Sequence, residues 1–483
     1  MTGHRINEII KSGLLTTGLL LAASSSASVQ LPAIISDHMV LQQQAPVQLW
    51  GWANPGETVT ASIGDSSGRT TADEDGNWQV SLPAMDAGGP YELTVSDSEI
   101  ELRVVDVLVG EVWLGSGQSN MQWPVSRAAN AEKEIASSDH NGIRMFTVEH
   151  KATATPQTDV NGRWLVAHPD HSGDFSAVGY YFSRHLYQKL DRPVGFIHSS
   201  WGGTRVEAWM GRAAFSRPVL ASFLSAEEDV KQNREREKAS IKSRGSQNEI
   251  SHLFNAMIAP ITTYPIKGVV WYQGERNANR DESDLYHDLF SAMIENWRLN
   301  WGRQLPFYFV QLANFRQREL ETPLISKWAE VRDAQRRTLA LPNTAMAVII
   351  DIGEADDIHP KNKQEVGRRL ALAALARQYG HDIAYSGPLY RNARFDGSDV
   401  EISFDYTDGL STVNDAPLVG FAIAGADRKF VWANARIEGE RIVVWSDAVK
   451  IPMSVRYGWG VNPETNLTNR SGLPASPFRT DGW

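Results

Sequence analysis

The sequence of 483 residues contains no cysteine. This absence excludes disulfide bonds, thiol catalysis and cysteine-ligated metal sites together. The histidines show neither the HxxxH nor the HExxH spacing of a zinc-binding helix, and no GxxxxGK[ST] segment is present to cradle phosphates. We therefore expect a protein that uses no metal and no other cofactor.

Positive charge is also scarce relative to negative charge, because 47 lysines and arginines face 57 aspartates and glutamates, which gives a formal net charge of −10. No lysine- or arginine-rich run interrupts this balance, which argues against a nucleic-acid surface. Uninterrupted apolar runs are short as well. After residue 28 none approaches the roughly twenty residues that span a bilayer, so we expect no membrane anchor in the mature chain.

The amino terminus has the pattern of a secretory signal peptide. Basic residues precede an apolar stretch over 14–23, and small residues follow it over 24–28. The apolar stretch is too short to remain as a stable membrane span, and small side chains are what a signal peptidase prefers. We expect a cleaved signal peptide over 1–28 and a mature protein that is periplasmic or secreted.

Hydrophobic periodicity divides the rest of the chain into three parts. Over 29–106 short apolar runs alternate with turn signals, which predicts an N-terminal β-sandwich-like domain. Over 107–384 strands alternate with helical stretches, which predicts an α/β domain with a mostly parallel sheet between helices. Within it, we expect the charged stretch 226–249 to form a solvated helical excursion. Over 385–483 the β texture returns and predicts a C-terminal sandwich-like module.

Ser119 is the candidate nucleophile. It lies in the segment Gly-Gln-Ser-Asn-Met, shortly after the mostly apolar run 107–114 that is typical of a buried strand. A strand that ends in a glycine turn and opens a helix would expose the hydroxyl and direct backbone N–H groups at it, together with the positive end of the helix. From the residues alone, the alternative is an ordinary strand-to-helix turn with a serine cap.

A second polar cluster, 351–360, follows another apolar run and contains the candidate base, His359. Pro360 suits the first turn of a helix, so His359 should also lie at a strand-to-helix junction. Asp356, three residues earlier, can fold back and accept the Nδ1 proton, which leaves Nε2 free to deprotonate the serine. Asp357 can do the same from an irregular loop. Otherwise these acidic residues only cap a helix in solvent.

Two glycine-bearing segments that follow apolar strands, 194–204 and 268–277, are candidates for an oxyanion hole. A backbone without side chains can approach a substrate closely and donate an N–H group, and the amide of Gln273 is a natural further donor. From the residues alone, the double glycine at 202–203 can equally be a tight turn, and Gln273 can cap a loop.

Aromatic and charged residues beside these segments are candidates for substrate contacts. Trp123 and Trp201 have flat faces that suit sugar rings, although tryptophan is more often a core residue. Arg205, Glu275 and Arg276 can bind sugar hydroxyls or a carboxylate. They can also orient the oxyanion loops through hydrogen bonds, which is the role that we favour for Glu275.

Together these residues carry a family resemblance. The chain resembles the sialate O-acetylesterase-like carbohydrate esterases of the SGNH hydrolase superfamily. The resemblance implies a flavodoxin-like three-layer catalytic domain. The segments that carry it occur in the family's order and are Gly115–Trp123, Ser200–Thr204, Glu207–Trp209, Trp271–Glu275 and Asp357–Lys363.

The resemblance also implies roles for individual residues. Ser119 would be the nucleophile and give the first oxyanion N–H, Gly203 would be the second donor, and His359 would be the base. Gln273 would be the third donor, although other members of the superfamily have an asparagine there. The superfamily's spacing between aspartate and histidine selects Asp356, whereas the sialate-esterase-like string contains Asp357, so both remain candidates for the acid.

We therefore expect a serine esterase that removes O-acetyl groups from a carbohydrate in two acyl-transfer steps. Sialic acid is the substrate that the family's name suggests, and acetylated plant hemicellulose, such as xylan or xyloglucan, is the other. The many tryptophans and the lack of an evident basic cluster for a sugar carboxylate favour hemicellulose. The alternative class is a glycan-binding protein on an inactive hydrolase scaffold. The oligomeric state stays open.

Overall fold

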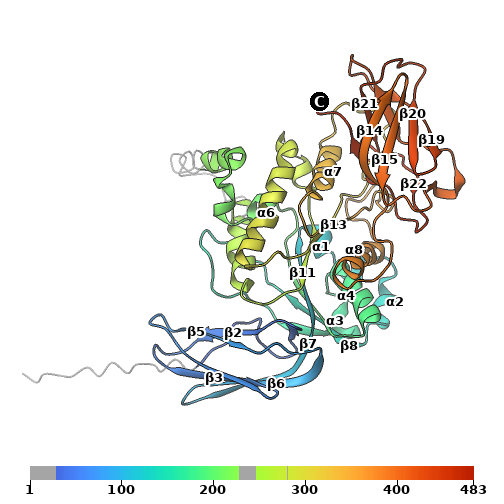
Figure 1. Ribbon diagram of the computed structural model, residues 1–483. Helices are drawn as coiled ribbons and strands as arrows, with labels where there is room; N and C mark the ends of the chain where they lie inside the picture. The colour runs from blue at the N-terminus through green and yellow to red at the C-terminus, as the bar shows by residue number, and fades with distance from the viewer. Residues whose placement is uncertain (1–28, 228–245, 280) are drawn as a thin grey trace, which may run out of the picture.

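The structure, a computed structural model, describes residues 29–227, 246–279 and 281–483. The expected signal peptide and most of the expected charged excursion lie outside these residues. Three parts follow one another in Figure 1: a β-rich module at the amino-terminal end, a layered α/β domain, and a second β-rich module at the carboxyl-terminal end. None of the helices in the described ranges combines the length and the apolar character needed to cross a membrane.

The amino-terminal module consists of short strands whose side chains alternate between interior and surface. In β2 (Val47–Trp52) and β5 (Asn77–Leu82), which pair antiparallel, every second residue is buried. β7 (Glu101–Gly117) pairs with β6 (Gly88–Ser96) in this module and continues without a break into the central sheet. The expected domain boundary at residue 106 therefore falls inside one strand. Other strands of the module are β1 (Val40–Gln42), β3 (Thr58–Ile63) and β4 (Ser66–Thr71).

The α/β domain is built on a central sheet whose strand order is β13, β12, β11, β7, β10, β8, β9. All neighbouring strands are parallel except β9, which pairs antiparallel with β8 at one edge. In this sheet β7 is buried from Val107 to Gly117, as expected for a parallel strand that is covered on both faces. The other strands are β8 (His140–Thr147), β9 (Trp164–Ala167), β10 (Val194–Ser200), β11 (Gly268–Tyr272), β12 (Phe307–Val310) and β13 (Thr344–Ala347).

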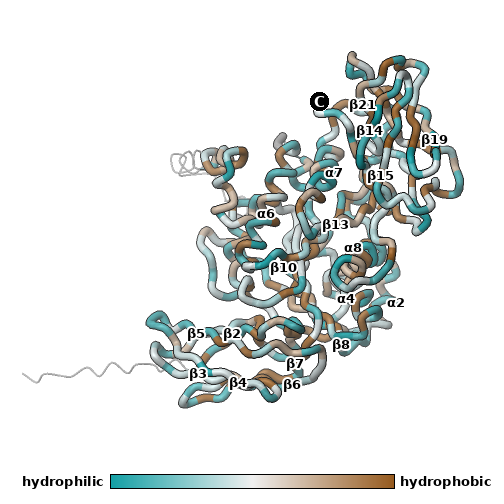
Figure 2. The backbone as a smooth tube through the Cα atoms, in the orientation of Figure 1, coloured by the Kyte–Doolittle hydropathy of each residue, from teal (hydrophilic) through white to brown (hydrophobic). Residues whose placement is uncertain are grey.

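Helices cover both faces of the central sheet. Val112 and Leu114 of β7 belong to the hydrophobic core that includes α6 and α7, whereas Trp113 belongs to the core that includes α4 and α8. Successive side chains of one strand thus enter opposite layers. In Figure 2 these helices show hydrophobic and hydrophilic stretches in alternation, as helices with one buried face do. The expected three-layer α/β architecture is confirmed. The helices are α1 (Ser119–Gln122), α2 (Ala131–Ala136), α3 (Pro169–Ser172), α4 (Ala177–Leu190), α6 (Tyr286–Asn300), α7 (Lys327–Thr338) and α8 (Lys363–Gln378).

The start of α8 differs from the sequence-based expectation. Pro360 precedes the helix instead of lying in its first turn, because Asn362 is the cap and its side chain accepts the N–H of Glu365. The loop between β13 and α8 is therefore longer than the proline suggested.

The carboxyl-terminal module contains two main antiparallel sheets around its own hydrophobic core. One sheet has the order β14, β15, β20, β19, and the other has the order β18, β17, β21, β23. The strands are β14 (Leu389–Asp396), β15 (Asp399–Asp405), β16 (Ser411–Thr412), β17 (Phe421–Ala424), β18 (Val431–Trp432), β19 (Asn434–Glu438), β20 (Arg441–Trp445), β21 (Ser454–Tyr457), β22 (Leu467–Thr468) and β23 (Phe478–Arg479).

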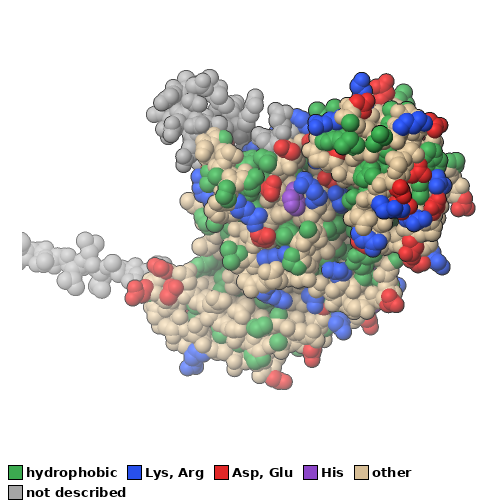
Figure 3. Space-filling view, turned by 45° about the horizontal axis from the view of Figure 1, so that its top comes forward, with side chains coloured by type: hydrophobic (Ala, Val, Ile, Leu, Met, Phe, Trp, Pro, Cys, Tyr) green, Lys and Arg blue, Asp and Glu red, His purple; other side chains and the backbone are tan. Residues whose placement is uncertain are grey.

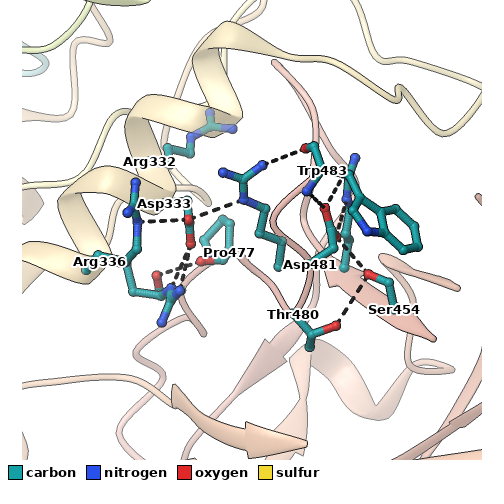
Figure 4. Close-up of polar contacts among 12 residues, drawn as sticks. Arg332, Asp333, Arg336, Ser454, Pro477, Thr480, Asp481 and Trp483 are labelled. Carbon is teal, nitrogen blue, oxygen red and sulfur yellow. Dashed lines mark hydrogen bonds and ion pairs between the residues drawn. The ribbon is translucent and has the colours of Figure 1, made fainter. Parts of the chain in front are cut away.

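Buried charges attach this module to α7. Asp333 of α7 lies 2.7 Å from the guanidinium of Arg336 in the same helix and 3.5 Å from that of Arg479 in the module. Figure 4 shows Asp333 and Arg336 on the helix that faces the segment with Asp481. Asp481 forms a pair of 2.7 Å with Arg456, and both side chains are 1% exposed. Arg332 is fully buried and donates to four backbone carbonyls, which belong to Leu312, Ala313, Gly460 and Val461.

Candidate active site

Three strands of the central sheet end beside one another at the same edge. Gly117, the last residue of β7, is paired in register with Ser200 at the end of β10 and with Tyr272 at the end of β11. In an open parallel sheet this carboxyl edge is where ligands bind. The segments that follow the three strands, although far apart in the sequence, therefore meet in one place.

The turn after β7 presents Ser119. Gly117 has a φ of +134°, and a Cβ there would lie 2.1 Å from the carbonyl oxygen of Tyr272, so this position requires glycine. Gln118 is still extended, and Ser119 is the first residue of α1. Because the first N–H groups of a helix have no partner within it, the serine hydroxyl lies beside backbone donors.

His359 reaches Ser119 from the loop that precedes α8. Its Nε2 lies 2.9 Å from the serine Oγ, which is hydrogen-bonding distance. The imidazole stacks on the indole of Trp123, with the ring centres 4.7 Å apart and an angle of 14° between the rings. The indole N–H in turn donates to the carbonyl of Arg127 at 3.0 Å. The imidazole is thus held in its plane while one nitrogen faces the hydroxyl.

Of the two candidate acids, Asp357 is the one that lies beside His359. Its Oδ1 accepts the backbone N–H of His359 at 2.8 Å and lies 3.4 Å from the ring Nδ1. Asp356 is exposed, and its carboxylate faces the side-chain amide of Gln317 at 3.4 Å. The local reason is an Asx-type turn, in which an aspartate bonds the N–H two residues further along the chain.

The surroundings keep His359 neutral near neutral pH. Partial burial lowers the pKa of the imidazole from its ordinary value of 6.5, and the positive charge of Lys363 acts in the same direction. The Asp357 carboxylate opposes both effects by favouring the imidazolium, without reversing the direction of the pKa shift. A neutral imidazole is the form that can accept a proton from Ser119.

The double glycine at 202–203 lies against Ser119. The N–H of Gly202 donates to Oε1 of Gln122 at 2.8 Å, and a Cβ on Gly202 would come within 3.3 Å of the Cβ of Ser119. Gly203 has a φ of +71°, and a Cβ there would meet no atom within 4 Å. No acceptor in the described parts of the chain takes up its N–H, so this donor stays available for a ligand oxygen.

Gln273 does not lie at the surface of the site. It is fully buried, and its amide nitrogen donates to the carbonyl of Thr204 at 3.1 Å and to Oδ1 of Asn277 at 2.7 Å. Its Oε1 accepts the hydroxyl of Tyr286 at 2.8 Å. Both amide hydrogens therefore have partners within the fold. These contacts fit a side chain that supports the glycine segment from below, and they leave no hydrogen for an oxyanion.

A cavity of about 690 Å³ opens at the serine and the histidine. Of the substrate-contact residues expected from the sequence, Trp123 lines it, and Trp201 stacks at 4.3 Å on His150, which lines it too. The lining consists of Ser119, Gln122, Trp123, Pro124, Arg127, Thr147, Val148, Glu149, His150, Asp174, His198, Ser200 and His359.

The three charged residues expected beside the substrate are not among the residues that line the cavity. The Arg205 guanidinium donates to the carbonyl of Asn248, and the Glu275 carboxylate is buried and accepts the amide of Asn120 at 2.5 Å. Arg276 is exposed, and its backbone N–H donates to Oε1 of Gln118 at 3.2 Å. Glu275 thus contacts Asn120, the neighbour of Ser119, and its orienting role stays a prediction.

Sequence patterns did not single out Arg127 or His150. The Arg127 guanidinium lies 4.0 Å from the ring centre of Trp123 in the cavity wall. His150 follows β8, which is the neighbour of β10 in the sheet. The sequence could have indicated Arg127, because it follows Trp123, the last residue of the first family segment, by four residues. His150 could be found only from the order of the strands in the sheet, which a sequence does not show.

The described residues offer no metal-binding cluster, and charges of both signs are mixed on the face that is shown. Among the described residues, no group of three or more histidine, aspartate and glutamate side chains is arranged to hold a metal ion. On the face shown in Figure 3, basic and acidic side chains are interspersed and neither sign forms a continuous patch.

Comparison with known proteins places the chain among esterases. The family described as "carbohydrate esterase, sialic acid-specific acetylesterase" matches residues 109–376. The sialate O-acetylesterase of Mus musculus is 31% identical over 94% of this chain and 95% of its own length, and that of Homo sapiens is 35% identical over 77% and 76%. The crystal structure of a carbohydrate acetylesterase from Xanthomonas citri superposes with a TM-score of 0.86 at 41% identity, covering 94% of this chain and all of that one.

Proposed function

Because the chain belongs to the sialic acid-specific acetylesterase family of carbohydrate esterases, and is therefore a carboxylic-ester hydrolase, we propose that it removes O-acetyl groups from a carbohydrate by acyl transfer through Ser119. The observation that carries this proposal is the 2.9 Å contact between Ser119 Oγ and His359 Nε2, both of which line the cavity. A nucleophile paired with a base in this way is the signature of covalent catalysis by a serine.

The first step is attack on the acetyl carbonyl. Nε2 of His359 takes the proton of the Ser119 hydroxyl as Oγ bonds to the carbonyl carbon, and the carbonyl oxygen becomes an oxyanion. The backbone N–H groups of Ser119 and Gly203 stabilise that oxyanion. Asp357 stabilises the imidazolium that forms, because its carboxylate lies 3.4 Å from Nδ1. The tetrahedral intermediate then collapses, and the imidazolium protonates the departing sugar oxygen.

The second step regenerates the enzyme. Water gives a proton to His359 Nε2 and attacks the acetyl-serine ester, and the bond between the acetyl carbon and Oγ breaks as Oγ regains a proton. Acetate leaves. Stacking on Trp123 keeps the imidazole in one orientation through both steps.

For the sugar, we propose O-acetylated sialic acid as the first candidate. Arg127 supports this choice, because it is the arginine in the cavity wall and it pairs with no carboxylate among the described residues. Its guanidinium can bind the sugar's carboxylate, a role for which Arg205 and Arg276 were the candidates from the sequence. Acetylated hemicellulose is the second candidate, and the stacked aromatic rings of Trp123 and Trp201 beside the cavity support it.

The acyl-transfer proposal is tested with 4-nitrophenyl acetate, butyrate and octanoate. Ser119→Ala should abolish acetate-selective turnover while the melting temperature is unchanged. The matched control is Ser200→Ala, because Ser200 also lines the cavity, and its hydroxyl contacts His198 at 2.6 Å rather than His359. Turnover that survives in Ser119→Ala, or that is lost equally in both variants, would refute Ser119 as the nucleophile and reopen a glycan-binding role.

The choice between substrates is tested by measuring acetate release from O-acetylated sialic acid and from acetylated xyloglucan side by side. If the Arg127 guanidinium binds a carboxylate, Arg127→Met should raise KM for the sialic acid about 10-fold or more and leave the neutral polymer unaffected. Equal losses on both substrates would argue against a carboxylate-specific role, and faster wild-type release from xyloglucan would favour the second candidate.

We also propose export through the signal peptide expected over 1–28. Sequencing the amino terminus of protein isolated from its native host tests this directly. A mature chain that starts near residue 29 is expected, and an intact amino terminus would contradict the proposal.

A further inference from the structure

Two charged side chains lie buried beneath the catalytic pair and take no part in the proposed acyl transfer. Lys363, the first residue of α8, is 0% exposed, and Glu275, just after β11, is 3% exposed. Charged groups are rarely buried without a partner, because removing them from water is costly. Their placement therefore requires a reason in either packing or function.

Asn120 connects the two charges. The ammonium of Lys363 donates to its Oδ1 at 2.5 Å, and its amide donates to a carboxylate oxygen of Glu275, also at 2.5 Å. The same amide donates to the carbonyl of Ile358 at 3.0 Å. Asn120 follows the nucleophile directly, and Ile358 directly precedes His359. One side chain thus joins the serine turn to the histidine loop, and a charge on each side of it fixes its orientation.

We propose that Lys363 is a positioning residue, which holds the amide of Asn120 in the one orientation that keeps Ser119 and His359 within hydrogen-bonding distance. Without the ammonium, the Asn120 amide could turn over and present its nitrogen where the oxygen is needed. Its bonds to Glu275 and Ile358 would then be lost together. This inference rests on the roles of Ser119 and His359 under the proposed function.

The position of Lys363 also gives it an electrostatic effect on the base. Its ammonium lies 6.0 Å from the ring centre of Trp123, on which the imidazole of His359 stacks, and 5.4 Å from that of Tyr272. The charged groups that act on it are Glu275 from the β11 loop, and Asp357 and Glu354 from the histidine loop. Burial lowers the pKa of Lys363 to about 7, against the pull of these three carboxylates.

On the acid side of neutrality Lys363 is therefore protonated. Its positive charge there contributes to the lowered pKa of His359. Removing that charge should raise the pKa of the imidazole. The pH dependence of catalysis consequently reports on Lys363 separately from any loss of packing.

The test uses three variants with 4-nitrophenyl acetate as substrate. Lys363→Met removes both the donor and the charge, whereas Lys363→Gln keeps a donor for Asn120 and removes the charge. Lys361→Met is the matched control, because it removes a lysine charge two positions away whose side chain is exposed. Thermal melting and near-ultraviolet circular dichroism establish that each variant is folded.

We expect Lys363→Met to lower kcat about 10²-fold with KM little changed, as small displacements of reacting groups do. Lys363→Gln should keep at least about a tenth of the wild-type kcat, because it restores the donor for Asn120. Both variants should move the acidic limb of kcat/KM to higher pH, and Lys361→Met should do neither.

Two results would overturn the inference. One is a folded Lys363→Gln or Lys363→Met protein with the wild-type kcat and pH profile. The other is equal loss of kcat in both variants with an unmoved acidic limb, which would mean that Lys363 only fills space. A failure of the proposed function would be recognised separately, because Ser119→Ala would then retain turnover.

Discussion

Replacing each of the two adjacent aspartates by asparagine tests the assignment of the triad acid. Asp357→Asn removes the charge 3.4 Å from Nδ1 of His359 and leaves an amide oxygen that can still accept the backbone N–H of His359. Asp356→Asn removes the same charge one residue away, from a carboxylate whose partner is the amide of Gln317. The two variants are nearly isosteric and have equal net charge, so each is a control for the other.

The size of the effect follows from the distance and the exposure. Two unit charges 3.4 Å apart attract by about 1 kcal/mol in a water-like dielectric and by about 5 kcal/mol at an effective dielectric constant of 20. The Asp357 side chain is 38% exposed, and that of His359 is 25% exposed. Solvent screening therefore favours the lower half of that interval, about 1 to 3 kcal/mol. Because 1.36 kcal/mol corresponds to a factor of ten, kcat should fall by about 5- to 150-fold.

The assay is the pH dependence of 4-nitrophenyl acetate hydrolysis by both variants. In Asp357→Asn, kcat should fall and the acidic limb of kcat/KM should move to lower pH, because the carboxylate that favours the imidazolium is gone. In Asp356→Asn both quantities should stay within about twofold of wild type, as for most exposed substitutions. A larger loss in Asp356→Asn than in Asp357→Asn would refute the assignment based on the observed contacts.

Three further predictions follow from the contacts. Since the pKa of His359 is lowered from 6.5, kcat/KM of the wild type should be half-maximal below pH 6.5 and fall as the pH falls further, and a midpoint above 6.5 in a pH profile would contradict this. Gly202→Ala should reduce kcat at least about 10-fold without lowering the melting temperature, because its Cβ would come within 3.3 Å of that of Ser119. An unchanged kcat would mean that the loop shifts to accommodate the methyl group without displacing Ser119. Asp481→Asn should destabilise the carboxyl-terminal module by about 3 to 5 kcal/mol in urea unfolding, because it leaves Arg456 buried without its charge partner; a loss below about 1 kcal/mol would mean that solvent reaches the arginine.

The layered fold was predictable because periodicity is strong where strands are buried on both sides. The apolar run 107–114 corresponds to the buried part of β7, and the helical stretches expected within 107–384 include α4 (Ala177–Leu190). The boundary at residue 106 was not predictable in the same way, because β7 continues through it. No residue pattern marks the point at which one strand exchanges its partners in the amino-terminal module for those in the central sheet. The start of α8 was predicted too early from Pro360 for a local reason. Asn362 caps the helix, and proline is also compatible with the loop before a cap.

The candidate site was predictable in its backbone and less so in its side chains. The turn at Gly117 and the candidate nucleophile Ser119 were found, because a turn that requires glycine leaves a signature in the sequence. Gln273 was expected at the oxyanion hole, but its amide donates to Thr204 and Asn277. Such partners depend on which groups lie nearby in the folded protein, and the sequence does not show this. Arg127 was missed although it follows Trp123 by four residues, because only the folded structure shows that it lines the cavity.

The carboxyl-terminal module has a physical connection to the histidine loop that its place at the end of the chain does not suggest. Asn462 of the module accepts the amide of Asn314 at 2.9 Å and donates to the carbonyl of Arg316 at 2.5 Å. Asn314 in turn accepts the N–H of Gly353 at 2.8 Å, and the N–H of Arg316 donates to Ala355 at 2.9 Å. Because Gly353 and Ala355 belong to the loop that carries Asp357 and His359, that loop is held from the module on one side and from Lys363 on the other. An acid and a base on an irregular loop need such support, since a loop without packing partners samples many conformations and the 2.9 Å contact with Ser119 requires one.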